Sequence, residues 1–169
     1  MYKLISKSDH CHGKVLDFLS LPFETRQRGR FKATTITGKE VGVFLTRGEV
    51  LREGDYLQSE CGHNFLVKAA PEELSQAKAS DWLTFAKACY HLGNRHTPLQ
   101  VGDMWLRFQP DHVLEQMVEM LGLTVTTVHG GFDPENGAYA QGLGGHHHGH
   151  GHAHDDDHQH QHSHEHSHA

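Results

Sequence analysis

Short apolar runs alternate with turn residues along the first 70 or so positions. Three of these runs are rich in β-branched and aromatic residues: FKATTIT (31–37), EVGVFL (40–45) and NFLVKAA (64–70). A segment that contains glycine follows each of the first two, and Pro71 follows the third. Runs of this composition between turn residues predict a small all-β unit. The pattern predicts no convincing helix before Pro71, although the run VLDFLSL (15–21) fits either a strand or a helix.

After Pro71 the apolar positions follow a helical period. The stretch from Ser80 to Gly93 predicts an amphipathic helix with Ser80 as its N-cap, Asp81 in its first turn and Gly93 as its stop. The apolar positions at helical spacing, expected to form its buried face, are Trp82, Phe85, Ala86, Cys89 and Leu92.

A hairpin and a second helix follow. PLQV (98–101) and MWLRF (104–108) flank Gly102-Asp103, which predicts a tight turn between two strands. Asp111 then caps a helix that ends before Gly122. The apolar residues at helical spacing in this helix are Val113, Leu114, Met117, Val118 and Leu121.

The element order after Pro71 is close to a known arrangement. LTVTTV (123–128) predicts a last strand, which gives the order αββαβ. One more strand before the first helix would complete the ferredoxin-like βαββαβ unit. The residues available are ELSQAKA (73–79), a poor strand sequence on propensity alone. Together the two parts predict an α+β protein.

From His129 the chain becomes rich in Gly, Pro and Asn and then in histidine. This end has low hydrophobicity and no aromatic residue after Tyr139, so it cannot bury enough surface to offset its ordering entropy. We expect it to be disordered without metal.

Composition and charge exclude several classes of partner. The 169 residues carry a formal net charge of -6, which gives no basic field for nucleic acid, and no run of about 18 apolar residues predicts a membrane span. The three cysteines, Cys11, Cys61 and Cys89, are far apart and odd in number, so they do not indicate a disulfide framework. A cytoplasmic location is the default expectation.

The histidine-rich end is the strongest chemical signal. Twelve of the 19 histidines lie there: His146, His147, His148, His150, His152, His154, His158, His160, His162, His164, His166 and His168. Imidazoles suit zinc, copper and nickel, and twelve of them would hold roughly three to six ions. An engineered tag is the alternative, but tags are usually uninterrupted histidine runs, whereas this segment mixes in Gly, Ala, Asp, Gln, Ser and Glu.

The other candidate ligands are single histidines. His96 follows Gly93 in an exposed connection and could face solvent or a partner, although a lone histidine is more often a surface or hydrogen-bonding residue. His91 lies near the end of the first predicted helix. His112 is the first helical residue after Asp111, where an ordinary polar role is the simpler interpretation.

The remaining histidines and cysteines have less support. DHCHGK (9–14) reads as an incidental polar segment, because an extended backbone would turn Cys11 away from the two flanking histidines. Cys61, His63 and His129 have weaker support still. We find no P-loop, GxSxG or HExxH motif, and Cys89 fits a core position better than a nucleophile, so no enzyme is predicted.

Several segments together resemble a known family. Three of them lie after Pro71: KACYHLGNRHTPLQ, DHVLEQMVEMLGLTV and FDPENGAYA. They are similar to the UreE family, the urease accessory proteins that act as nickel metallochaperones. Two earlier segments resemble the N-terminal part of that family: TRQRGR and LTRGEVLREGDYL. The resemblance implies a peptide-binding-like β domain at 1–71, a ferredoxin-like metal-binding and dimerisation domain at 72–143, and a histidine-rich tail at 144–169. It also supplies the missing strand near 73–79.

The resemblance further implies a function without a reaction. His96 from each subunit of a homodimer would share one nickel(II) ion as cargo, and His112 matches an accessory ligand. Gln109 and Pro110 stand where some relatives have more histidines, so an elaborate second site is in doubt. The implied partners are urease apoprotein and its accessory proteins, including a GTPase. A storage or detoxification protein for nickel, zinc or copper is the alternative, and a metal-dependent hydrolase is the least supported.

Overall fold

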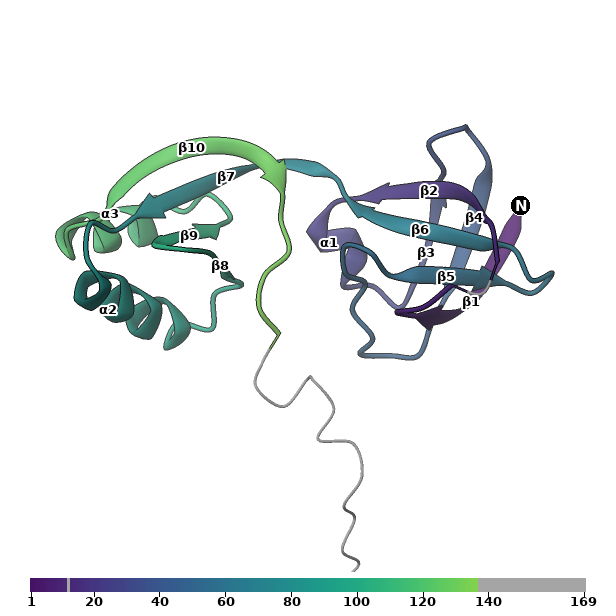
Figure 1. Ribbon diagram of the computed structural model, residues 1–169, viewed down its shortest axis with the longest axis horizontal. Helices are drawn as coiled ribbons and strands as arrows, with labels where there is room; N and C mark the ends of the chain where they lie inside the picture. The colour runs from purple at the N-terminus through teal and green to yellow at the C-terminus, as the bar shows by residue number, and fades with distance from the viewer. Residues whose placement is uncertain (12, 137–169) are drawn as a thin grey trace, which may run out of the picture. The chain divides into compact units, whose positions relative to one another are not determined.

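The first sheet of the protein is built from residues 2–69. The computed structural model describes residues 1–11 and 13–136. Its first part is a six-stranded sheet with the order β2-β6-β5-β1-β4-β3 (Figure 1). The strands are β1 Tyr2–Ser8, β2 Val15–Leu21, β3 Arg30–Thr34, β4 Glu40–Phe44, β5 Tyr56–Ser59 and β6 Asn64–Ala69. The pairs β1 with β4 and β2 with β6 are parallel, and the other pairs are antiparallel.

The ambiguous run VLDFLSL forms strand β2. Asp17, Leu19 and Leu21 are buried and the residues between them are exposed, which is the two-residue period of a strand. The prediction that no helix lies before Pro71 is wrong, because α1 (Phe23–Arg26) forms one short turn directly after Pro22. Pro22 is the N-cap in an extended conformation, and its carbonyl accepts hydrogen bonds from the N–H groups of Thr25 and Arg26 at 3.0 and 3.1 Å.

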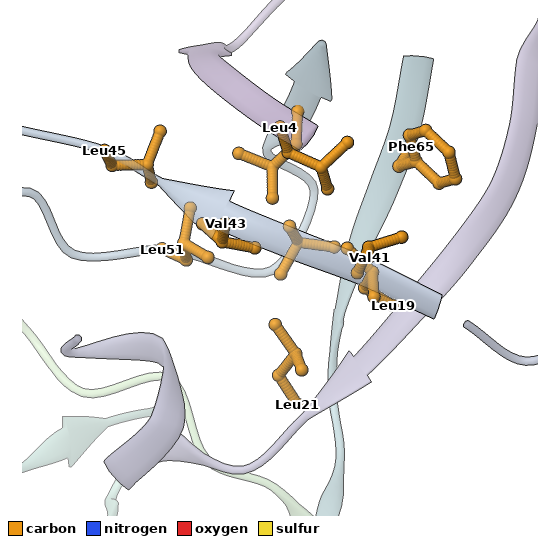
Figure 2. Packing of buried hydrophobic residues seen from close by; sticks show 10 residues of the cluster. Leu4, Leu19, Leu21, Val41, Val43, Leu45, Leu51 and Phe65 are labelled. Carbon is orange, nitrogen blue, oxygen red and sulfur yellow. The ribbon is translucent and has the colours of Figure 1, made fainter. Parts of the chain in front are cut away.

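The core of this sheet is aliphatic. Figure 2 shows Leu4, Leu19, Val41, Val43 and Phe65 in one cluster, and all five are fully buried. The apolar residues come from β1, β2, β4 and β6, so residues distant in the sequence share one cluster. Burial of this apolar surface is the main stabilising contribution for the sheet.

The second sheet has four strands and confirms the predicted α+β class. Its order is β10-β7-β9-β8, and the helices α2 and α3 connect the strands in the sequence βαββαβ (Figure 1). The elements are β7 Pro71–Lys78, α2 Trp82–Gly93, β8 Gln100–Val101, β9 Trp105–Phe108, α3 His112–Met120 and β10 Thr124–Gly131. Both helices share one core cluster with Ala77, Leu106 and Phe108, so they cover the same face of this sheet.

Strand β7 forms despite its poor strand propensity because its neighbours satisfy its polar groups. It pairs with β10 on one side and β9 on the other. Ser75 donates a hydrogen bond to Glu115, and Arg107 Nε donates to Gln76 Oε1 at 2.8 Å, although Ser75 and Gln76 are both buried. Buried polar groups with partners carry little penalty, so tertiary context overrides propensity.

The first long helix begins and ends one residue later than predicted. Asp81, not Ser80, is the N-cap of α2, because the Asp81 side chain accepts a hydrogen bond from the Thr84 backbone N–H. The Thr84 N–H is also the main cause that lowers the pKa of Asp81. Gly93 is the last helical residue and Asn94 the C-cap. Gly93 therefore does not stop this helix.

The buried face of this helix also differs from the prediction. Phe85, Ala88 and Leu92 are its buried residues, whereas Trp82 is 65% exposed and Ala86 is exposed. In α3 the predicted N-cap, Asp111, is confirmed. Its side-chain carboxylate accepts hydrogen bonds from the backbone N–H groups of Val113 and Leu114. Val113 was expected on the buried face but is 56% exposed.

The hairpin between β8 and β9 is present, but its turn is centred one residue later than predicted. The Gly102 N–H donates to the Trp105 carbonyl at 2.9 Å, which places Asp103 and Met104 at the centre. Met104 has a positive φ of 60°. A Cβ at Gly102 would meet the Trp105 ring at 2.0 Å, so only glycine allows this ring to pack there. Strand β10 runs to Gly131, past the predicted end at residue 128.

Arg26 is a fully buried cation that contacts residues far apart in the sequence. Its guanidinium donates to the carbonyls of Leu21, Leu51 and Phe132 and to Asp133 Oδ1, the last at 3.1 Å. A buried charge is tolerated when it is paired and hydrogen-bonded. In the part of the chain that the structure describes, we find no helix with the length and apolar character needed to cross a membrane.

Candidate metal site

His96 lies in a turn that the end of α2 creates. The N–H groups of Asn94, Arg95 and His96 donate in succession to the carbonyls of Tyr90, Leu92 and Gly93. His96 has a φ of 55°, and its side chain is exposed. A left-handed conformation is unfavourable for a residue with a Cβ, although histidine is enriched there. The backbone turn, rather than packing of the ring, therefore fixes where this imidazole leaves the chain.

His91 lies on the last turn of α2, five residues before His96. Its ring meets the Tyr90 ring edge to face, with the centroids 5.3 Å apart, and its carbonyl accepts a hydrogen bond from Arg95 Nη1 at 3.3 Å. The side chain is half-buried. A cation or a metal-bound imidazole at this position would interact favourably with the negative end of the helix dipole.

His112 is the first residue of α3 and is exposed. Asp111 fixes its position, because the Asp111 carboxylate accepts hydrogen bonds from the next two N–H groups of the helix. The ring is therefore attached to a well-defined helix start and is open to solvent.

These three histidines do not form a complete metal site on their own. Within residues 1–11 and 13–136, no group of three or more His, Cys, Asp or Glu side chains is placed to hold an ion. The histidines at 146–168, and the expected disorder of that segment, lie outside the described residues. Any ion at His96 would take its remaining ligands from elsewhere: from that segment, from another chain or from water.

Exposed apolar residues accompany the two helices that carry the histidines. On α2, Leu83 and Tyr90 are 66% and 67% exposed, and on α3, Val113 and Met120 are 56% and 83% exposed. Each pair is seven residues apart, which brings its two members to one face of the helix after two turns. The periodic pattern predicted Val113 in the core; the structure instead places it with Met120 on the outside. Contiguous apolar surface on a folded protein commonly marks an interface, which makes these four residues candidates for one.

The other residues considered from the sequence have simpler surroundings. Cys89 is partly buried beside the core cluster of the second sheet, and burial raises the pKa of its thiol, which suits a core residue better than a nucleophile. His129 Nε2 is 3.7 Å from Glu73 Oε2 on the neighbouring strand. The Cys11 thiol donates a hydrogen bond to the Gly13 carbonyl at 3.2 Å.

One pair that had little support in the sequence is close in space. Cys61 Sγ and His63 Nδ1 are 3.1 Å apart in the turn between β5 and β6. The signal available in the sequence was the spacing Cys-Gly-His between two strand-like runs, since a glycine turn can bring its flanking side chains to one side.

Comparisons with known proteins agree with this architecture. Residues 3–70 match the family model described as UreE urease accessory protein, N-terminal domain, and residues 72–168 match the C-terminal domain of the same protein. A urease accessory protein UreE from Psychromonas ingrahamii is 48% identical over 86% of this chain and 96% of its own length.

Further relatives carry the same name. The urease accessory protein UreE of Alteromonas mediterranea is 49% identical over 83% of this chain and 90% of its own length. That of Vibrio parahaemolyticus is 50% identical over 74% of this chain and 79% of its own length. With both parts of the chain matched and identities near one half, the chain belongs to the UreE family of urease accessory proteins.

Proposed function

We propose that the protein is a homodimeric nickel metallochaperone that delivers nickel(II) to the urease apoenzyme. As a member of the urease accessory proteins, the chain has its role in urease maturation and is not itself an enzyme. The observation that carries the proposal is His96, an exposed imidazole held by a left-handed backbone turn directly after α2, a helix that also exposes Leu83 and Tyr90.

A second copy of the chain would complete the site at His96. Two-fold dimers bring the same surface of each subunit together, so a residue close to the axis is present twice. The exposed pairs Leu83 with Tyr90 and Val113 with Met120 supply apolar surface for such an interface. Two copies of His96 would then bind one ion, with His91 and His112 as candidate accessory ligands.

Incomplete coordination suits delivery. A closed cage of four ligands is typical of structural metal sites, whereas open positions allow incoming ligands to bind before the first ones leave. With few protein ligands per subunit, nickel at His96 keeps positions for the receiving protein. The ion passes by ligand exchange without becoming free in solution.

We assign different tasks to the three parts of the chain. Residues 1–71 would contact partner proteins, which include the urease apoprotein and a GTPase among the accessory proteins; residues 72–143 would hold the transferable ion; and residues 144–169 would collect nickel. The location is cytoplasmic, which fits the three free cysteines at Cys11, Cys61 and Cys89.

The test is His96→Asn. Asparagine tolerates the left-handed backbone at this position, so the change removes the imidazole and keeps the turn. We expect calorimetry to show loss of the tightest nickel site, one ion per two chains. We also expect activation of urease apoprotein to fall at least about tenfold, as is usual when the surroundings of a metal are damaged.

His10→Ala, at another exposed histidine, is the matched control and should leave both results unchanged. An unaltered tight site together with normal urease activation in the His96 variant would refute the proposal. The twelve histidines at 146–168 favour a second candidate, a storage protein for nickel, zinc or copper. A storage protein would bind the same ions but would not transfer nickel to urease apoprotein.

A further inference from the structure

A tight turn between β5 and β6 holds Cys61 and His63 next to each other. The Ser59 N–H donates to the His63 carbonyl at 2.9 Å, and the Gly62 N–H donates to the Ser59 carbonyl at 2.9 Å. Gly62 has a φ of 82°, a conformation that glycine adopts without strain. The backbone of this turn is therefore fixed by its own hydrogen bonds, and the two side chains that flank Gly62 lie on one side of it.

Contacts with neighbouring residues hold both side chains in place. The His63 ring meets the Tyr2 ring edge to face with centroids 5.5 Å apart, and Tyr2 in turn contacts the fully buried Phe65. Cys61 Sγ lies 3.1 Å from His63 Nδ1 and 3.3 Å from Ser59 Oγ. The hydrogen bonds with Ser59 and His63 also lower the pKa of Cys61.

The separation of sulfur and nitrogen fits two ligands of one ion. With metal bonds of about 2.3 Å to sulfur and about 2.05 Å to nitrogen, cis ligands at a right angle are about 3.1 Å apart and tetrahedral ligands about 3.6 Å. The observed 3.1 Å matches the right angle. Thiolate and imidazole together suit zinc, copper and nickel. We propose that Cys61 and His63 form a second, two-ligand metal site for a divalent transition-metal ion.

One of the two proposed ligands, Cys61, borders a surface depression. This depression is lined by Met1, Tyr2, Lys3, Glu60 and Cys61. Lys3 and Glu60 form a solvent-exposed ion pair at 3.7 Å beside it. Both proposed ligands are exposed, so an ion can enter from solvent and can keep water or ligands from a partner protein. The site lies in the first sheet and does not depend on the function proposed for His96.

The test measures protection of a thiol by nickel in the full-length chain. Under anaerobic conditions, the protein is alkylated with iodoacetamide, with and without Ni²⁺ in excess of the histidine-rich segment, and each cysteine is followed by peptide mass spectrometry. We expect Ni²⁺ to slow alkylation of Cys61 at least about tenfold, the scale of a lost metal-site interaction. Cys89, partly buried in the second sheet, is the internal reference and should not change.

Two variants decide between this pair and other sources of protection. His63→Phe keeps an aromatic ring against Tyr2 but removes the nitrogen ligand, so protection of Cys61 should disappear. His96→Asn should leave the protection of Cys61 intact. Equal alkylation rates with and without Ni²⁺, protection that persists in the His63 variant, or protection lost in the His96 variant would each overturn the proposal.

Discussion

At the scale of single residues, a charged side chain is buried in the first sheet and held there by hydrogen bonds. Asp17 is 2% exposed in the middle of β2, where an apolar residue would be expected. Its carboxylate accepts hydrogen bonds from Thr37, from the Phe18 N–H at 2.8 Å and from Lys39 Nζ at 3.0 Å. Burial alone would raise the pKa of Asp17, but hydrogen bonds from Thr35, Thr37, Phe18 and Lys39 more than offset it and hold the pKa far below its usual range.

This depressed pKa predicts acid sensitivity with a definite sign. The stabilising contribution of Asp17 is complete above its unfolded pKa of about 3.9 and is lost as the pH falls toward the much lower folded pKa. We expect Asp17→Asn to lower the free energy of unfolding at pH 7 by about 2 kcal/mol.

The same variant should show a smaller loss of stability than the natural chain between about pH 4 and pH 2, because it has no carboxylate to protonate. Urea unfolding at several pH values measures both effects. Asp9→Asn, at an exposed carboxylate, is the control. Identical pH profiles for the Asp17 variant and the natural chain would contradict this explanation.

At the scale of elements, two glycines near the candidate site have opposite roles. Gly93 lies in the last turn of α2 without a positive φ, and a Cβ there would meet nothing within 4 Å. A Cβ at Gly102 would overlap the Trp105 ring, which also stacks on the Arg107 guanidinium at 4.5 Å. One glycine is replaceable and the other is required by packing.

Alanine substitutions should therefore change stability in opposite directions. Gly93→Ala should raise the free energy of unfolding by about 0.5–1 kcal/mol, because alanine is the better helix former. Gly102→Ala should lower it by roughly 1–3 kcal/mol through overpacking and should shift the tryptophan fluorescence. Chemical denaturation of the two variants measures both changes, and a shift of the same sign in both would show that the role of one glycine is misassigned.

Much of the element order follows from the sequence, because it depends on local period and turn residues. The helix predicted between Ser80 and Gly93 is confirmed with a shift of one residue at each end, and the cap at Asp111 and the strands around 40–45 and 64–70 are confirmed. Strand β7 could be inferred only from the family resemblance, since Glu115 and Arg107, which satisfy its buried Ser75 and Gln76, come from other elements. The exposure of Trp82 and Val113 depends likewise on which helix face meets the sheet.

The candidate site was harder to predict than the fold. The sequence singles out His96 as a residue after a helix, but its left-handed backbone depends on the helix continuing through Gly93. The closeness of Cys61 and His63 depends on the hydrogen bonds of one turn and on the aromatic contact with Tyr2. Neither hydrophobic period nor composition contains this information. The roles of His91, His96 and His112 as ligands stay predictions.

At the scale of the whole molecule, the two kinds of nickel site that we propose, at His96 and in the histidine-rich segment, should be separable by deletion and by pH. Truncation after Gly144 removes twelve histidines and should abolish most of the binding capacity, while the tight site at His96 should persist. Because free imidazole titrates near a pKa of about 6.5, the capacity of the full chain should also fall as the pH is lowered from about 7.5 to 5.5.

Equilibrium dialysis against Ni²⁺ at the two pH values, with intact and truncated chains, measures these capacities. The truncated form should still activate urease apoprotein at high nickel supply, where collection is not limiting. If truncation eliminated the tight site as well, the division between collection and transfer would be wrong.

The contacts of the buried Arg26 affect how the chain folds while the ribosome synthesises it. Its guanidinium partners at Phe132 and Asp133 lie 106 and 107 residues further along the chain. At about 5–20 residues per second, the ribosome takes roughly 5–20 seconds to add that stretch. During this interval the charge has to stay hydrated, so the region around α1 completes its packing only after β10 has been synthesised. The last packing step around α1 therefore takes place only after the residues that follow β10 have been made.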